Sequence, residues 1–237
     1  MEKQRLDKII ASTGKFSRRE VKALVRQGLV LVDGRLAASA EEKADPETTE
    51  IMVNGELLTY RQYTWVMLNK PAGYLSATED GRGKTVLDLL PEELQRQNLF
   101  PVGRLDKDTE GLLLLTNEGG LAHDLLSPRH HVDKVYYAKV QGKVDESDVK
   151  AFADGVDIGD DTLAKSADLR ILKSGKESEI ELTITEGRFH QVKRMFHAVG
   201  KEVIYLKRLS MGSLALDKTL TKGEYRSLTE EEIKKLC

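Results

Sequence analysis

The chain has 237 residues, of which 40% are hydrophobic and 32% are charged, and its formal net charge is −2. This composition is typical of a folded globular protein with enough chain for one or two domains. No apolar run of about 18 residues is present to cross a membrane, and no secretory segment opens the chain, so we expect a cytoplasmic location. The single cysteine, Cys237, excludes intramolecular disulfides and cysteine-cluster metal sites.

Positive charge is concentrated near the N-terminus. Residues 1–35 hold nine Lys and Arg residues against four Asp and Glu residues, whereas the rest of the chain holds 28 against 35. Such asymmetry is typical of a basic module that binds a polyanion. A solvated charged surface would give the same pattern at any one residue, so that alternative stays open at this point.

Two helices are predicted in this basic segment. The first covers residues 6–12, and the pattern from Ser17 to Glu20 is a capping box that starts the second, which should end before Gly28. Its apolar positions repeat with helical spacing and are expected to face a core. The cationic side chains left for a ligand are Arg5, Lys8, Arg18, Arg19, Lys22 and Arg26.

Two short hairpins are predicted after the helices. Residues 29–32 precede Asp33-Gly34, and residues 51–53 precede Asn54-Gly55, and both dipeptides are strong hairpin signals. Residues 3–58 resemble the S4 RNA-binding domain, because a pair of helices, the second of them basic, is followed by two hairpins in the same order. The resemblance implies that the cationic helices contact structured RNA mainly through phosphates and shape. We therefore expect an S4-like RNA-binding domain at residues 1–59.

A second domain is expected at residues 60–237. Four consecutive leucines at 112–115 predict a strand covered on both faces, with Gly111 interrupting the chain before it. Alternating strands and helices with hairpin-type turns predict an α+β domain rather than a parallel doubly wound one. No Walker loop or GxGxxG pattern occurs, so a nucleotide cofactor is not indicated. The other predicted strands are 63–68, 134–140 and 179–185, and the predicted helices are 85–94 and 188–199.

An acid-rich loop stands directly before the leucine strand. Asp106, Asp108 and Glu110 lie next to a segment that must be buried, with Arg104 and Lys107 beside them. Carboxylates at such places are either structural caps or reacting groups, and this stretch alone leaves both interpretations open.

The predicted helix at 188–199 has a basic side. Its apolar residues form one stripe, and His190, Lys193, Arg194 and His197 lie opposite that stripe at about 100° per residue. A solvated basic face is the ordinary interpretation. The helix follows a strand after a single turn, however, so its first residues are expected to border a cleft.

Four segments, in this order and spacing, resemble the RsuA-type ribosomal RNA pseudouridine synthases. They are LNKPAGYLSAT, GRLDKDTEGLLLLTNEG, SPRHHVDKVYYAKV and EGRFHQVKRMFHAVG. With the S4-like domain, the resemblance covers nearly the whole chain. It implies a mixed, largely antiparallel sheet flanked by helices, with the active site in a central cleft and with neither metal nor cofactor.

The resemblance also implies roles for individual residues. Asp106 matches the catalytic aspartate of these enzymes, and Arg104 matches the arginine that pairs with it. Tyr136 matches the tyrosine of a K-x-Y strand, which stacks on the target base. Lys193, in preference to the equally cationic residue after it, matches the basic position near the aspartate. Lys70 is expected to contact RNA, with a plain strand-ending turn as the alternative.

The chemistry agrees with these residue types. Pseudouridine formation breaks the bond from N1 to C1′ and rebuilds it from C5, and a carboxylate can assist as a nucleophile at C1′ or C6, or as a base on the ribose. SPRHH favours small-subunit 16S rRNA as the substrate. A 23S enzyme and a non-catalytic RNA-binding ribosome-assembly factor are the alternatives. The expected partner is rRNA or a subunit assembly intermediate, bound by a monomer, because no exposed apolar stripe calls for a second protein.

Overall fold

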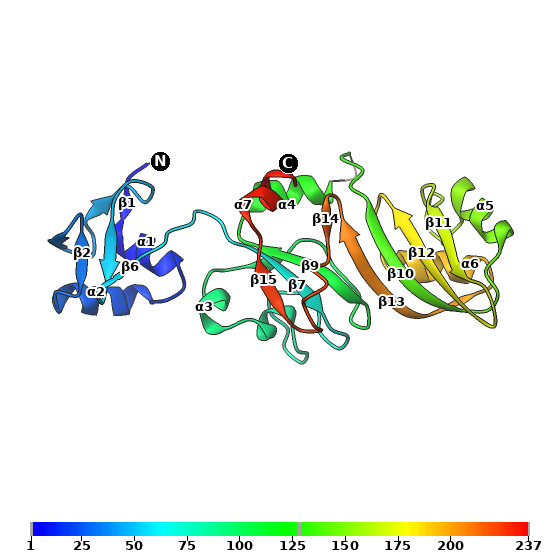
Figure 1. Cartoon of the computed structure of the whole chain (residues 1–237), viewed down its shortest axis with the longest axis horizontal. Coiled ribbons are helices and arrows are strands. Elements are labelled where there is room, and N and C mark those ends of the chain that lie inside the picture. The colour runs from blue at the N-terminus through cyan, green and yellow to red at the C-terminus, as the bar shows by residue number, and fades with distance from the viewer. Residues whose placement is uncertain (1, 128, 237) are drawn as a thin grey trace. The chain divides into compact units, whose positions relative to one another are not determined.

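The computed structural model describes residues 2–127 and 129–236 (Figure 1). The chain divides into two compact units. One holds the residues up to Thr64 together with Leu90–Leu99, and the other holds Trp65–Leu89 together with the residues from Phe100 onward. The expected boundary between residues 59 and 60 stays a prediction. None of the helices in the described residues is both long and apolar enough to cross a bilayer.

The N-terminal unit contains the two predicted helices, α1 (Leu6–Ser12) and α2 (Arg18–Arg26). The capping box is confirmed, since Ser17 Oγ accepts from the Glu20 amide and the Glu20 carboxylate accepts from the Ser17 amide. A buried cluster joins the helices to the small sheets. The strands of this unit are β1 (Gln4–Arg5), β2 (Val30–Val32), β3 (Arg35–Leu36), β4 (Lys43–Ala44), β5 (Ile51–Val53) and β6 (Glu56–Leu57).

Both predicted hairpins are confirmed in this unit. The four-stranded sheet has the order β3-β2-β5-β6, and β1 pairs with β4 beside it. Asp33 and Gly34 have φ of 48° and 76°, and Asn54 and Gly55 have φ of 53° and 81°. Two successive positive φ angles are what a two-residue type I′ hairpin turn requires.

The second unit is built on a mixed sheet of nine strands within the described residues (Figure 1). The main order is β11-β12-β10-β13-β9-β7-β15, and the pairs are antiparallel except for β9 with β13. The predicted α+β class with a largely antiparallel sheet is therefore confirmed. The strands are β7 (Trp65–Lys70), β8 (Phe100–Pro101), β9 (Glu110–Thr116), β10 (Lys134–Gln141), β11 (Asp168–Lys173), β12 (Glu177–Ile184), β13 (Glu202–Met211), β14 (Leu214–Ala215) and β15 (Tyr225–Ser227).

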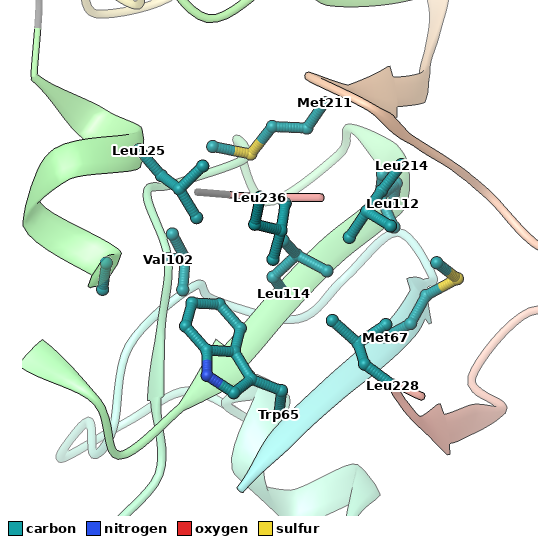
Figure 2. Close-up of a cluster of buried hydrophobic side chains, with 11 residues drawn as sticks. Trp65, Met67, Val102, Leu112, Leu114, Leu125, Met211, Leu214, Leu228 and Leu236 are labelled. Carbon is teal, nitrogen blue, oxygen red and sulfur yellow. The ribbon is translucent and has the colours of Figure 1, made fainter. Parts of the chain in front are cut away.

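The leucine strand β9 lies inside this sheet, between β7 and β13, and every one of its residues is buried. Figure 2 shows Leu112 and Leu114 facing a cluster that includes Trp65 and Met67 of β7. The prediction that Gly111 interrupts the chain before the strand is wrong. Gly111 is part of β9 with φ of +99°, and the backbone of β13 approaches so closely that a Cβ atom would overlap it.

The helices predicted between residue 85 and residue 199 are shorter in the structure. The helix predicted over 85–94 is instead the 3₁₀ helix η1 (Val86–Leu89) followed by α3 (Glu92–Gln95). Pro91 separates them, because proline cannot donate a backbone hydrogen bond and restricts the residue before it. The helix predicted over 188–199 is α6, which begins three residues later. The remaining bounds are α4 (Gly119–Leu126), α5 (Glu146–Asp154), α6 (Gln191–Ala198) and α7 (Glu230–Lys234).

Candidate active site on the acidic loop

The acidic loop runs from β8 into β9, and a buried lysine holds its backbone. Lys70, at the end of β7, donates from Nζ to the carbonyl oxygens of Asp106 at 3.0 Å, Lys107 at 3.2 Å and Thr109 at 2.8 Å. A fourth carbonyl, that of Pro71, lies 3.2 Å away. An ammonium group has three donors, so these acceptors share its full hydrogen-bonding capacity.

Lys70 is therefore corrected from an RNA contact to a buried support of the loop. Its side chain is 0% exposed, which leaves no surface for a ligand to touch. Burial lowers the pKa of Lys70 to about 8, although the carboxylates of Asp108, Asp106 and Glu110 oppose that shift. The sequence suggested a plain turn as the alternative, and neither interpretation predicted an ammonium group directed into the loop.

Two further contacts fix the same loop. Ser76 Oγ donates to the carbonyl of Leu105 at 2.9 Å and accepts from the Leu105 amide at 3.1 Å. The amide of Gly73 donates to the carbonyl of Lys107 at 2.7 Å. The backbone on both sides of Asp106 is thus anchored to the segment that follows β7.

The carboxylate of Asp106 faces the start of α6. Lys193 Nζ lies 3.1 Å from its Oδ2, and His190 Nε2 lies 3.6 Å from its Oδ1. Lys193 also contacts Asp108 Oδ1 at 2.6 Å. Burial alone would lower the pKa of Lys193, but its two carboxylate partners prevail and raise it above the usual value. Burial would likewise raise the pKa of Asp108, and the hydrogen bond from Lys193 instead holds it below its usual value.

The geometry separates Lys193 from its neighbour Arg194. The Arg194 guanidinium bonds Asp160 and the carbonyls of Phe189 and Ile158, on the side of α6 away from Asp106. Its task is to hold the segment before β11 against α6. The preference for Lys193 as the cation beside Asp106 therefore agrees with the contacts in the structure.

Arg104 does not form the expected ion pair with Asp106 in this structure. Within residues 2–127 and 129–236, the basic side chains within 4 Å of the Asp106 carboxylate are Lys193 and His190. Arg104 is an exposed residue that lines the same pocket. The expected pairing is therefore corrected, whereas a role of Arg104 in substrate binding stays a prediction.

Tyr136 lies in the wall of the pocket that contains Asp106. It is 7% exposed and belongs to the buried side of β10. Tyr137 points to the other side, as strand alternation predicts, and donates from its hydroxyl to Glu179 at 2.7 Å. The residues lining the pocket come from the acidic loop, β10, β12, β13 and the start of α6: Arg104, Leu105, Asp106, Thr109, Tyr136, Ile184, Gly187, Arg188, His190, Gln191, Val192 and Leu206.

Comparison with known proteins identifies this arrangement. Residues 64–198 match the family described as RNA pseudouridylate synthase, and residues 4–49 match the S4 domain. The chain belongs to the RNA pseudouridine synthase family. It is 52% identical over 231 residues to an uncharacterised RNA pseudouridine synthase of Bacillus subtilis (strain 168), covering 97% of this chain and 96% of the relative.

Two other similarities extend over the whole synthase. It is 41% identical over 230 residues to ribosomal small subunit pseudouridine synthase A of Escherichia coli (strain K12), covering 97% of this chain and 98% of that protein. A crystal structure of a pseudouridylate synthase superimposes with a TM-score of 0.70 at 38% identity, covering 99% and 100% of the two chains. The RsuA-type resemblance and the S4 domain are thereby confirmed, and the protein is an RNA pseudouridine synthase.

The S4 unit of the synthase exposes its predicted cations, but not all of them are free. Arg5 is paired with Asp7 at 2.9 Å and with Glu41 at 3.1 Å, and Lys22 is paired with Glu41 at 3.3 Å. Within the described residues, the cations of this set that make no ion pair are Lys8, Arg18, Arg19 and Arg26. Contact of these six residues with RNA stays a prediction.

The structure adds one residue to the site that the sequence assigned no role. His190 has φ of 48° and ψ of 34°, a left-handed conformation that is uncommon for residues other than glycine, and it lies immediately before α6. No local pattern announces this conformation. Among the described residues, no group of three or more His, Cys, Asp and Glu side chains could hold a metal ion. The SPRHH motif includes Pro128, which lies outside the described residues.

Proposed function

We propose that the protein isomerises a specific uridine of small-subunit 16S rRNA to pseudouridine, with Asp106 as the catalytic carboxylate. The observation that supports the assignment of Asp106 is that it lines the same pocket as Tyr136 and lies 3.1 Å from Lys193. The 41% identity to a ribosomal small subunit pseudouridine synthase, over nearly both whole chains, supports the choice of substrate.

Each residue has a distinct part in the proposed reaction. Lys193 contacts the Asp106 carboxylate at 3.1 Å and places a positive charge beside it. The uridine leaves its stack in the RNA and its base rests on the ring of Tyr136. Asp106 then assists cleavage of the bond from N1 to C1′, and the base is rejoined through C5 while the C5 proton is lost.

Rigidity is the second requirement of this chemistry. A reacting carboxylate is effective only when its backbone is fixed close to the productive geometry. The hydrogen bonds from Lys70, Ser76 and Gly73 to the acidic loop supply that fixation. In the S4 unit, the cationic helices would hold the rRNA through its phosphates and so deliver the target uridine.

Tritium release from rRNA labelled at C5 of uridine tests the proposal. Transcripts of 16S and 23S rRNA and the corresponding subunit particles are incubated separately with the wild type, with Asp106→Asn and with Asp108→Asn. Asp108 is the matched control, because it contacts the same Lys193 but is 72% exposed and absent from the wall that contains Tyr136. We expect release from 16S substrates, a decrease of roughly 10³-fold or more in Asp106→Asn, and a change below roughly tenfold in Asp108→Asn.

The outcomes separate the alternatives. Release from 23S substrates alone would keep the reaction and overturn the proposed substrate. Full activity of Asp106→Asn would remove that residue from the chemistry. Tight binding of RNA by the wild type without release from any substrate would favour an RNA-binding assembly factor over an active enzyme.

A further inference from the structure

An aromatic ring stands exposed beside the pocket. Phe189 is 71% exposed, more than any other large apolar side chain recorded as exposed among residues 2–127 and 129–236. It directly precedes His190, whose imidazole lines the pocket and lies 3.6 Å from the Asp106 carboxylate. A solvent-exposed ring of this size next to the reacting group calls for a physical explanation.

The ring of Phe189 is ordered although it is exposed. It stacks on the His190 ring with centroids 3.8 Å apart and an interplanar angle of 18°. The Phe189 carbonyl accepts from Arg194 Nη1 at 3.1 Å, which holds the backbone in place. One face of the ring is thus covered by the imidazole, while the exposed fraction of the side chain leaves the other face open to a ligand.

The left-handed backbone of His190 produces this stack. Positive φ is uncommon for a residue with a side chain and, where it persists, often marks a functional site. Here it turns the chain just before α6, so that the imidazole contacts Asp106 on one side and Phe189 on the other. The exposed ring is therefore tied to the pocket through one intervening side chain.

The surroundings favour a nucleic-acid base as the ligand. Arg188 lines the pocket, and the guanidinium groups of Arg188 and Arg194 are both paired with Asp160. These contacts hold the segment that carries Phe189 in place, and nucleobases stack on flat aromatic rings. An isolated exposed phenylalanine would be unremarkable, but this one is pre-ordered and adjacent to the place where a uridine must enter.

We propose that the outer face of Phe189 is a stacking platform for the base of a nucleotide that flanks the target uridine. The target itself rests on Tyr136, and the flanking base extends the stack of His190 and Phe189. This inference rests on the proposed function, because it assumes that the target uridine enters the pocket of Asp106 and Tyr136. It identifies Phe189 as a residue that helps to bind the RNA and to select the nucleotides next to the modified one.

Binding measurements in a catalytically silent background test the platform. Asp106→Asn is combined with Phe189→Leu, with Phe189→Trp or with Leu172→Ala, and equilibrium binding of 16S and 23S rRNA transcripts is measured over a series of salt concentrations. Leu172 on β11 is the control, as it is an exposed apolar residue whose neighbours in the sequence do not line the pocket, whereas Phe189 stacks on a residue that does. Thermal melting confirms that each variant is folded.

We expect Phe189→Leu to weaken binding by roughly 5- to 150-fold, the range for loss of one stacked base. The loss should be the same at every salt concentration, because no phosphate contact is removed. Phe189→Trp should bind as the parent does, since it keeps a flat ring, and Leu172→Ala should also be unchanged. RNA containing 5-iodouridine should photo-crosslink to residue 189 of the parent protein.

The contrary results are equally definite. Equal affinity of Phe189→Leu and the parent, or equal losses in the leucine and tryptophan variants, would overturn the platform. If the wild type releases no tritium but the Phe189 variants bind as expected, the proposed reaction is refuted and the stacking role of Phe189 is retained. Failure of the parent to bind either rRNA would overturn both.

Discussion

The buried ammonium of Lys70 gives the sharpest test of how the acidic loop is held. In Lys70→Met, a side chain of similar length replaces the ammonium with an apolar thioether. The carbonyls of Asp106, Lys107 and Thr109 then lose a charged donor at 2.8 to 3.2 Å. Methionine fits the same space, so any effect comes from the lost hydrogen bonds and the lost charge.

The size of the effect follows from two opposing contributions. Hydrogen bonds to a charged group contribute roughly 1.5–3 kcal/mol each, so three of them contribute about 5–9 kcal/mol. Burial of the charge opposes this, because a pKa lowered from 10.5 to about 8 corresponds to about 3 kcal/mol at neutral pH. The net loss of unfolding free energy in Lys70→Met should therefore be about 2–6 kcal/mol at pH 7.

The pH dependence gives a second signature. Between pH 8 and the unfolded value near 10.4, the unfolded chain still holds the Lys70 proton while the folded protein has released it, so the unfolding free energy rises with pH. This rise should be smaller in Lys70→Met than in the wild type, because Lys134, whose pKa burial also lowers, still contributes to it. Urea unfolding from pH 7 to pH 10.5 measures both features, with tritium release as the readout of loop geometry. If Lys70→Met has the same stability and the same turnover as the wild type, Lys70 does not hold the loop.

Three further changes test other parts of the structure. Lys193→Met removes the cation shared by both loop carboxylates and should lower single-turnover tritium release by at least tenfold, on the scale of a lost charged hydrogen bond, whereas Arg194→Met should change it less. Gly111→Ala places a Cβ atom against β13 at a residue with φ of +99°, and it should lower the unfolding free energy measured in urea by more than about 2 kcal/mol. Its control is Gly73→Ala, where φ is +94° but the space is open, and the loss should be about 1 kcal/mol. Ser17→Ala removes the cap of α2 and should destabilise that helix by about 1 kcal/mol, seen as faster amide exchange in the intact protein.

Features determined by near neighbours in the sequence were predicted well. The capping box at Ser17, the turns at Asp33-Gly34 and Asn54-Gly55 and the two-sided burial of the leucine strand are all confirmed. Each depends on residues within four positions of one another, so the local pattern contains the information. Tyr136 and Tyr137 were also separated correctly, because strand alternation is a local property.

Features determined by distant contacts were not predicted. Lys70 reads as an exposed lysine at the end of a strand, and only the arrival of a loop 36 to 39 residues later makes it a buried donor. The ion pair expected of Arg104 is likewise absent among the described residues, because whether its side chain reaches the carboxylate depends on the folded loop and not on the local sequence. The left-handed turn at His190 has only a weak signal in the residue type, because histidine adopts that conformation more often than most residues but still in few cases.

The acidic loop itself shows why several carboxylates can lie beside a buried strand. Asp106 and Asp108 share one cation, and Glu110 is paired with a second cation from another part of the chain. Lys193 of α6 contacts both Asp106 and Asp108, while Glu110 is held by Lys222 at 2.8 Å and by a tyrosine hydroxyl from β13. Glu110 is nearly buried and Asp108 is largely exposed, whereas Asp106 alone of the three lines the pocket wall that includes the tyrosine ring. Charge pairing thus lets the loop fold, and position relative to the pocket decides which of its carboxylates is able to react.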